Sequence, residues 1–167
     1  ELLKEISGGK FVRVKGVATI DKFDSELTIG SIVGIKKCAD FTTVRMDTSV
    51  EKRIELHCHT KMSDMDGVSD VKDIINRAKS WGHKAIAITD HGVMYGVIDF
   101  YRAARAEGIN PILGCEVYVA PGSRFDREAG SGEDRYYHLV LLAENNQGYA
   151  NLMKIVSKGF TEGFYYK

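Results

Sequence analysis

Two histidines separated by one residue, His57 and His59, are the side chains whose types and spacing most directly suggest chemistry. They end a run with the composition of a β-strand, in which alternate side chains point to the same face. Asp66 follows within one loop's reach. Paired imidazoles beside a carboxylate suit a divalent transition metal such as zinc or manganese. Two surface histidines on an edge strand would show the same spacing, so the rest of the chain has to decide.

Further metal-type residues stand where later strands are expected to end. His91 follows the apolar run 85–89, and Glu116 lies late in the run 111–118. Because the carboxyl ends of parallel strands meet at one edge of a sheet, these side chains should converge on the first pair. Packing alone rarely gives this pattern, since a buried imidazole or carboxylate without a partner is costly. His138 stands near the start of the next run, so it fits the pattern less well.

Several imidazoles and carboxylates together indicate a site for two or three metals, and phosphoester hydrolysis is the chemistry that such a site suits. We expect Asp90 to bridge metals or to orient His91 from the second shell, as ligating histidines often require. Cys58 and Cys115 alternate away from the neighbouring ligands, so packing is their expected role. His83, at the opposite end of the sheet, is expected to be a solvated loop residue.

Three basic side chains are candidate phosphate contacts: Lys61, Arg124 and Arg127. Two of them lie in a polar loop, at 121–135, which is rich in Gly, Arg and Asp. A charged loop is more often simply solvated, and both interpretations stay open.

From residue 50 the chain alternates strand and helix patterns. The expected strands are 53–57, 85–89, 111–118 and 137–143, and the expected helices are 68–81 (capped by Ser69), 95–107 and 146–158. Repeated βα units predict an α/β fold with a parallel sheet or a (β/α) barrel and right-handed crossovers. The order of elements therefore places the ends of several strands, and the residues named above, at one face.

Residues 1–49 have a different, β-rich pattern. Apolar and charged residues alternate at 10–16, a polar turn follows 17–20, and 26–32 can return along the first strand, with short extended candidates at 32–37 and 42–46. A segment this small rarely buries a sufficient core alone. We expect either a tail packed on the next domain or the end of a larger β unit, compatible with a small nucleic-acid-binding barrel. Its few aromatic residues favour plain packing.

Composition limits the alternatives. The 23 basic and 23 acidic side chains balance, which argues against this segment alone being a strong electrostatic nucleic-acid binder. Three cysteines without CxxC spacing indicate a reducing, cytoplasmic setting. No apolar run approaches the ~18 residues of a membrane span and no signal peptide opens the chain, so we expect no membrane partner.

Four segments resemble the polymerase-and-histidinol-phosphatase (PHP) domain as it occurs at the amino terminus of the C-family replicative polymerases, the DNA polymerase III alpha subunits of bacteria. They are 57–67 (HCHTKMSDMDG), 88–92 (ITDHG), 114–125 (GCEVYVAPGSRF) and 137–143 (YHLVLLA). The resemblance covers about residues 50–167. Residues 1–49 look like the end of the oligonucleotide-binding (OB) domain that precedes the PHP domain in the long form of this enzyme.

The resemblance implies a distorted (β/α)7 barrel, of which residues 50–167 would be the amino-terminal part and residues 1–49 an OB-like segment. It implies up to three divalent metals, zinc or manganese, and in some members the removal of 3′-terminal nucleotides. The ligands carried over are His57, His59, Asp66, His91, Glu116 and His138. The catalytic residues would be four of these ligands: His57, His59, His91 and Glu116. The parent protein would be a magnesium-dependent DNA-directed DNA polymerase whose partners are primer–template DNA and other replisome subunits.

Two departures from the family pattern bear on activity. The long form interrupts its PHP domain with an exonuclease after the strand that carries Glu116, whereas this chain runs on like the short form, so it resembles a mosaic of the two. The chain also ends after about four strands, without later ligands, so we expect the isolated fragment to be inactive. A free-standing PHP phosphatase for small phosphomonoesters and a non-catalytic, metal-stabilised scaffold remain the alternative hypotheses.

Overall fold

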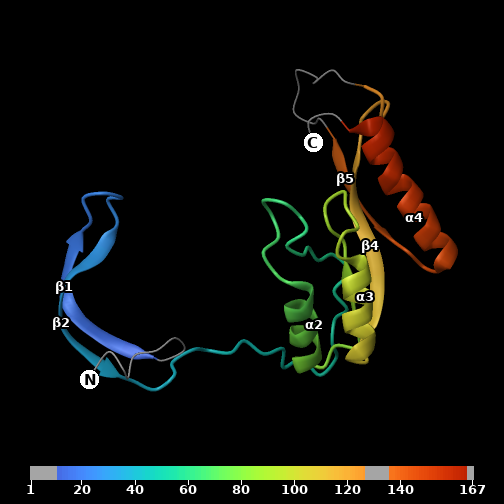
Figure 1. The fold of residues 1–167 in the computed structure, drawn as a ribbon. Coiled ribbons are helices and arrows are strands. Elements are labelled where there is room, and N and C mark those ends of the chain that lie inside the picture. Colours follow the sequence, from blue (N-terminus) through green and yellow to red (C-terminus); the bar gives the residue numbers. More distant parts are fainter. Residues whose placement is uncertain (1–10, 127–135, 165–167) are drawn as a thin grey trace. The chain divides into compact units, whose positions relative to one another are not determined.

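The computed structural model describes residues 11–126 and 136–164. Contacts within the chain divide it into two compact units, unit 1 ending at Arg45 and unit 2 beginning at Met46. Figure 1 labels the helices and strands of both units.

Unit 1 is a two-stranded antiparallel hairpin. Strand β1 (Val12–Ile20) pairs with β2 (Leu27–Lys37), with irregularities in the register near Gly16 and Ala18. The extended candidate at 32–37 is therefore the second half of β2, whereas the structure has no strand at 42–46. Most apolar side chains of the hairpin are exposed, as expected for a segment too short to form its own core. Its kinship with an OB domain stays a prediction.

Unit 2 contains the expected alternation of helices and strands. The elements are α2 (Val71–Ser80), β3 (Ala85–Ile88), α3 (Val97–Ala106), β4 (Asn110–Val119), β5 (Tyr137–Leu142), α4 (Asn146–Lys158) and a π-helical turn η1 (Gly159–Gly163). Helix α2 begins later than predicted because its cap is Asp70, whose side chain accepts from Lys72 N, and not Ser69. Gly82, with φ of +79°, follows the helix where a left-handed residue is needed.

The predicted strand at 53–57 was wrong in extent. Only one bridge forms there, between Glu55 and Ile86, with hydrogen bonds from Ala87 N to Glu55 O and from Thr89 N to Cys58 O. The Glu55 carboxylate accepts the backbone N–H of His57 (3.1 Å). The His57 N–H thus bonds to a side chain of its own segment at the point where strand pairing with β3 stops.

The sheet of unit 2 has the order β3-β4-β5. Strands β3 and β4 are parallel, as predicted, but β5 runs antiparallel to β4, so the wholly parallel arrangement was wrong. An antiparallel strand starts where its neighbour ends, and Tyr118 accordingly pairs with His138. The start of β5 therefore lies at the same edge as the carboxyl ends of β3 and β4. The described part of the fold is mixed α/β, and closure into a barrel stays a prediction.

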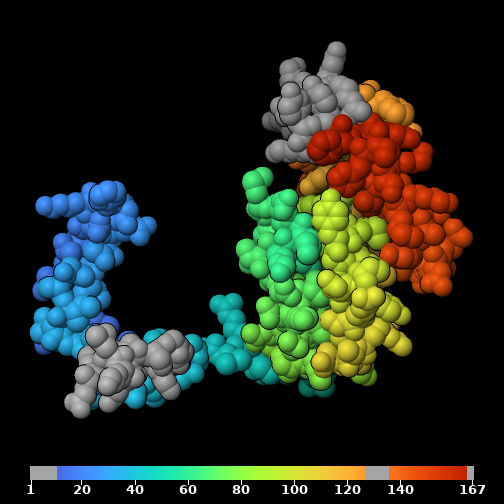
Figure 2. All heavy atoms as spheres, in the orientation of Figure 1, coloured from blue at the N-terminus to red at the C-terminus, as the bar shows by residue number. Residues whose placement is uncertain are grey.

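A single hydrophobic core fixes this arrangement. Helices α2 and α3 pack against each other and lie side by side in Figure 2, while α2 also contacts β3 and α3 contacts β4. The core residues are Val71, Ile75, Ala78, Ile86, Ile88, Val97, Phe100, Ala104 and Ile109. Strand β3 is buried along its whole length, which matches its continuous apolar sequence. In the described ranges, no helix has the length and apolar character needed to cross a membrane.

Candidate metal centre

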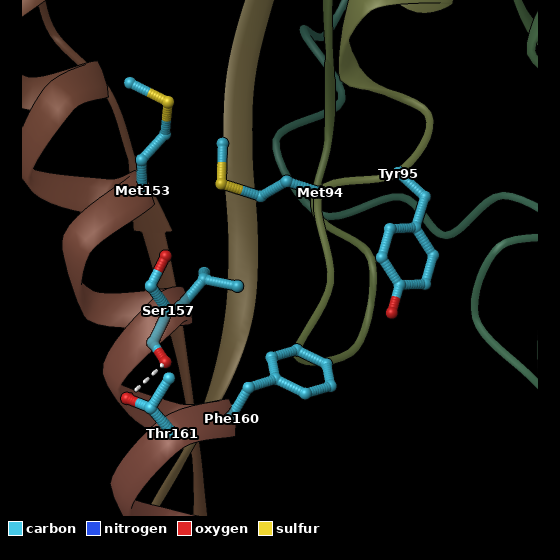
Figure 3. A pocket seen from close by; sticks show the side chains of 7 residues that line it. Met94, Tyr95, Met153, Ser157, Phe160 and Thr161 are labelled. Carbon is cyan, nitrogen blue, oxygen red and sulfur yellow. Dashed lines mark hydrogen bonds between the residues drawn. The ribbon is translucent and has the colours of Figure 1, made fainter.

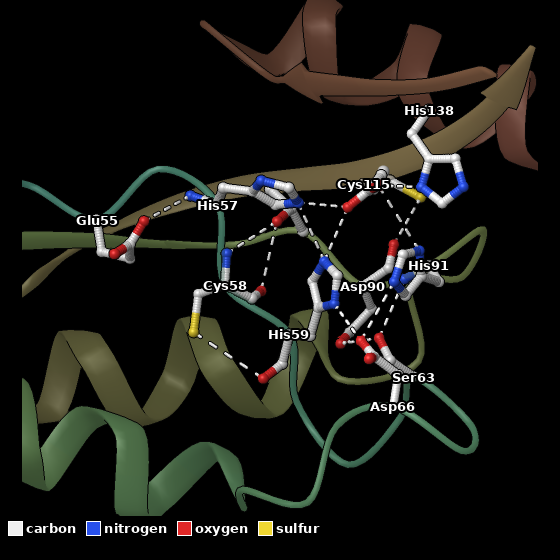
Figure 4. A network of polar contacts seen from close by, with 12 residues as sticks. Glu55, His57, Cys58, His59, Ser63, Asp66, Asp90, His91, Cys115 and His138 are labelled. Carbon is white, nitrogen blue, oxygen red and sulfur yellow. Dashed lines mark hydrogen bonds and ion pairs between the residues drawn. The ribbon is translucent and has the colours of Figure 1, made fainter.

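Six side chains converge at the edge where β3 and β4 end and β5 begins (Figure 4). They form three overlapping groups of three, and within each group the potential ligand atoms lie within 4.8 Å of one another. The groups are His57–His59–Glu116, His59–Asp66–His91 and His91–Glu116–His138. We call these six residues the histidine–carboxylate cluster. The structure thus brings together every residue that the sequence analysis named as a metal ligand.

Glu116 is the centre of the cluster. Its Oε2 contacts Nε2 of His57 and lies 2.8 Å from Nε2 of His59, while its Oε1 contacts Nδ1 of His138. The glutamate is 3% exposed, so its charge is withdrawn from water and surrounded by imidazoles. Backbone hydrogen bonds from Glu116 N to Asp90 O and from Gly92 N to Glu116 O hold β4 against the segment that follows β3.

A second carboxylate, Asp66, approaches from the loop after the histidine pair. Its Oδ2 lies 2.6 Å from Nδ1 of His59 and 3.2 Å from Nε2 of His91. His59 therefore connects the two carboxylates, one at each ring nitrogen. Asp66 is half exposed, unlike Glu116, so the cluster has a buried base and a solvent-facing rim.

Asp90 positions this loop from beneath. Its carboxylate accepts hydrogen bonds from Thr60 N (2.6 Å), Thr60 Oγ1 (2.8 Å) and Ser63 Oγ (2.8 Å), and it is 2% exposed. Ser63 Oγ in turn accepts the backbone N–H of His91. The loop also requires Gly67, since a Cβ there would lie 1.9 Å from Thr60 O. Asp90 belongs to none of the three groups, and Ser63 links it to the backbone N–H of His91. Its role as a metal bridge or as a residue that orients His91 stays a prediction.

The charges of the cluster shift its protonation. Burial alone would raise the pKa of Glu116, but hydrogen bonds with His57, His138 and His59 outweigh it and lower that pKa to about 2. Burial also disfavours the charged form of His59, yet its bonds to Asp66 and Glu116 raise its pKa above the ordinary value. The metal-free cluster therefore keeps its carboxylates charged and binds a proton on His59 more readily than a free imidazole does.

The donor set fits a divalent metal. His57 Nε2 and His59 Nε2 lie 3.2 Å apart, close to the separation of about 3.3 Å between two nitrogens bound to one tetrahedral ion at about 2.0 Å. His91 Nδ1 is buried, has no hydrogen-bond partner in the described ranges and lies 3.8 Å from Glu116 Oε1. That distance is too long for a hydrogen bond but suits two ligands of one ion. The residues could thus hold more than one divalent ion.

Two of the candidate phosphate contacts form ion pairs with residues outside the cluster. Lys61 Nζ pairs with Asp70 (2.6 Å) at the start of α2, and Arg124 Nε donates to Glu162 (2.5 Å) while stacking on Phe125. Neither ion pair includes a cluster residue. Arg127 lies outside the described residues.

Two cysteines and one histidine were predicted to have no role as metal ligands. Cys115 is buried and bonded to Asp90 O, and burial raises the pKa of its thiol to about 11, so packing is its role as predicted. Cys58 is half buried, and its Sγ lies 4.0 Å from the backbone oxygen of His59. His83 is not solvated as expected: its side chain is 12% exposed and pairs with Asp47 (3.2 Å).

The sequence analysis missed two tyrosines. Tyr118 lies parallel to His91, with ring centroids 5.9 Å apart, and Tyr136 lies beside His138 at 5.6 Å. In sequence, Tyr118 is part of the expected strand 111–118, where tyrosine is common, and Tyr136 directly precedes the expected strand 137–143. Their proximity to the histidines follows from the strand register, in which Tyr118 pairs with His138 and Tyr136 precedes His138 by two residues.

A separate hollow lies between the start of α3 and the end of α4 (Figure 3). Met94, Met153 and Phe160 are among its lining residues, and the lining is mostly apolar. It includes none of the cluster residues and no titratable group suited to metal binding.

Comparisons with known proteins identify relatives of this region. The DNA polymerase III subunit alpha of Chlamydia pneumoniae is 49% identical over 113 residues, covering 68% of this chain and 9% of the relative. That of Treponema pallidum (strain Nichols) is 50% identical over 114 residues, covering 68% of this chain and 10% of the relative. The chain thus spans about a tenth of the length of these curated relatives.

Among solved structures, an amidohydrolase from Chromobacterium violaceum with bound sulfate and no metal is 28% identical, with a TM-score of 0.44, and the match covers 63% of this chain and 34% of that chain. The PHP domain family matches residues 55–167, a range that includes the whole histidine–carboxylate cluster. This region is similar to DNA polymerase III subunit alpha at close to half of its positions. The chain belongs to the PHP domain family.

Proposed function

We propose that the histidine–carboxylate cluster binds two or three divalent ions, zinc or manganese, and hydrolyses a phosphoester at a 3′-terminal nucleotide. The observation that carries the proposal is Glu116, a buried carboxylate that contacts three imidazoles and shares two of the three ligand groups. Imidazole and carboxylate together suit zinc and manganese. Ions held there would lower the pKa of water and neutralise charge on phosphate oxygens.

The roles that we propose for the cluster residues follow from how deeply each side chain is buried. Glu116, His59 and His91 form the buried base, where their contacts hold the ligand atoms in place before any ion arrives. His57 and His138, about half exposed, lie at the rim, where a substrate phosphate can reach them. Asp66 is similarly exposed and orients His59 and His91. Asp90 fixes the loop that carries Asp66, which is a positioning role.

We further propose that this region is part of a C-family replicative polymerase. Identity near 50% to two DNA polymerase III alpha subunits supports this, although the match covers only a tenth of their length. The parent activity would be magnesium-dependent DNA synthesis, with primer–template DNA and other replisome subunits as partners. The hairpin of unit 1 would then be the end of an OB-type domain, and unit 2 the beginning of a PHP barrel.

The test is removal of a 3′-terminal nucleotide by the gene product that carries this segment, supplied with zinc or manganese. We expect His57→Ala and Glu116→Ala to lower the rate by at least ~100-fold, since removing groups that hold or position a metal ligand commonly costs 10- to 100-fold. His83→Ala, a histidine outside the cluster, is the matched control and should leave the rate unchanged. Equal rates in all variants would refute catalysis at the cluster.

The same assay separates the two alternatives. Hydrolysis of small phosphomonoesters but not of DNA ends would favour a phosphatase. Binding of metal with no hydrolysis of either substrate, together with a raised melting temperature, would favour a structural scaffold, because metal bound only to the folded state stabilises it.

A further inference from the structure

Two tyrosines lie beside imidazoles of the cluster. Tyr118, on β4, is inclined by only 7° to the ring of His91, and Tyr136 by 27° to the ring of His138. The tyrosines also contact each other edge to face, with centroids 4.8 Å apart. Tyr118 in addition meets the edge of His138 at 5.0 Å. These four rings form one continuous aromatic surface that borders the ligand atoms.

Packing alone explains this surface poorly. Tyr118 is 43% exposed and Tyr136 is 39% exposed, although each could have been buried against a core of aliphatic residues. Exposed aromatic side chains next to a site of chemistry are typical of ligand contacts. Gly92, whose φ is +62°, lies beside the Tyr118 ring, and a Cβ there would make an ordinary contact at 3.6 Å from Cε2, so the ring does not crowd this turn.

We propose that Tyr118 and Tyr136 form a stacking platform for the base of the nucleotide whose phosphate lies at the cluster. This inference rests on the proposed function and names its substrate class more closely. In a nucleotide, one sugar separates the base from the phosphate. Tyr118 and Tyr136 lie directly beside the rings of His91 and His138, so a base could reach them from a phosphate held at the cluster. Stacking tolerates every base, because each has a π-face, so the platform would select nucleotides without selecting a sequence.

The platform distinguishes a nucleotide from a bare sugar phosphate. Stacking of one base on an aromatic side chain contributes enough to change affinity by about 5- to 150-fold. The gain applies only to ligands that carry a base. It would therefore appear as a ratio between two ligands that share the same phosphate and sugar.

The test measures binding and needs no turnover. Two single-stranded oligonucleotides with a phosphorothioate at the last linkage are compared, one ending in 2-aminopurine and one ending in an abasic residue, with manganese present. The wild-type chain should bind the first about 5- to 150-fold more tightly and quench its fluorescence. Tyr118→Leu and Tyr136→Leu should each reduce this ratio, and Tyr118→Phe should restore it. Tyr137→Leu is the control, since Tyr137 alternates to the other face of β5.

The results separate stacking from support of the imidazoles. Equal weakening of both oligonucleotides in the leucine variants, with weaker manganese binding, would show that the tyrosines only position His91 and His138, and would overturn the platform. A wild-type ratio near one, or no binding of either oligonucleotide, would overturn it as well. Failure of the chain to cleave an ordinary 3′ end would refute the proposed function alone, because the fluorescence ratio is read without cleavage.

Discussion

The two ends of strand β3 carry histidines in contrasting surroundings. His83 precedes the strand and His91 follows it, and each has a buried Nδ1 without a hydrogen-bond partner in the part of the chain that the structure describes. His83 faces one carboxylate, Asp47, which also pairs with Lys52 (3.5 Å). His91 faces two carboxylates and the rings of His59 and His138.

The difference lies in the balance of charge and the number of donors. At the His83 end, Lys52 already neutralises the charge of the Asp47 carboxylate, so these residues form an ordinary ion pair. At the His91 end, two carboxylates meet four imidazoles. Among the described residues, the ion-pair partners of these carboxylates are histidines and not lysine or arginine. A buried, unpaired imidazole nitrogen is thus a sign of a metal only where other ligand atoms converge on it.

The largest effect should come from Glu116→Gln. The amide keeps the shape of the side chain but removes the charge shared by two ligand groups. Because even outer-shell changes cost 10- to 100-fold in metal affinity, we expect a loss of at least ~100-fold for zinc or manganese. Isothermal titration calorimetry measures it. A metal affinity within threefold of the wild type would contradict the inference that metal binds at the His91 end of β3 and not at the His83 end.

Asp90→Asn should have the next largest effect. The asparagine can accept only part of the three hydrogen bonds from Thr60 and Ser63, so the loop that carries Asp66 loses its fixed position. We expect about a tenfold loss of metal affinity and a loss of about 1–3 kcal/mol in the free energy of unfolding. Calorimetry and urea denaturation check the two values. A stability loss with unchanged metal affinity would show that Asp90 serves the fold alone.

Metal affinity should rise with pH in the neutral range. Because the pKa of His59 is raised, the metal-free cluster keeps a proton on this imidazole at pH values above the ordinary imidazole pKa of about 6.5. A metal ion must displace that proton in order to bind. Each proton displaced makes the apparent affinity change by about tenfold per pH unit below that pKa. Glu116, with a pKa of about 2, contributes no proton near neutrality. Titrations between about pH 5.5 and about pH 7.5, one unit either side of the ordinary imidazole pKa, measure this slope, and a flat profile would contradict it.

Protonation and stability without metal follow from the same shifts. The raised pKa of His59 stabilises the folded state below about pH 6.5 and this gain is lost as the pH rises through the folded value. The lowered pKa of Glu116 stabilises it above about pH 4.5 and this gain is lost as the pH falls toward 2. Metal-free unit 2 should therefore be most stable between about pH 4.5 and 6.5.

The smallest effect should come from His83→Gln. It removes one partner of Asp47 but leaves the lysine pair, so we expect metal affinity within about twofold and a stability loss of about 1 kcal/mol. Thermal melting with and without zinc measures both. A metal affinity that fell as far as in Glu116→Gln would show that the two ends of β3 are not independent.

Much of the cluster could be predicted from sequence because its ligands follow short local rules. The spacing of His57 and His59 and the position of His91 after a buried apolar run depend only on neighbours along the chain. His138 was placed poorly because the direction of β5 is set by the connection to β4, and an apolar strand has the same pattern in either direction. The Asp47–His83 pair joins residues that no periodicity relates. The tyrosines were missed because stacking depends on a register between strands.

The central claim is that metal binds at the cluster and not at the other histidine of the same sheet. Anomalous diffraction from crystals of this chain grown with manganese or zinc tests it most directly. We predict anomalous peaks between His57, His59, Asp66, His91, Glu116 and His138, with ligand distances of about 2.0–2.2 Å, and no peak at His83. A cluster without a peak at saturating metal, or a peak at His83 alone, would contradict the account.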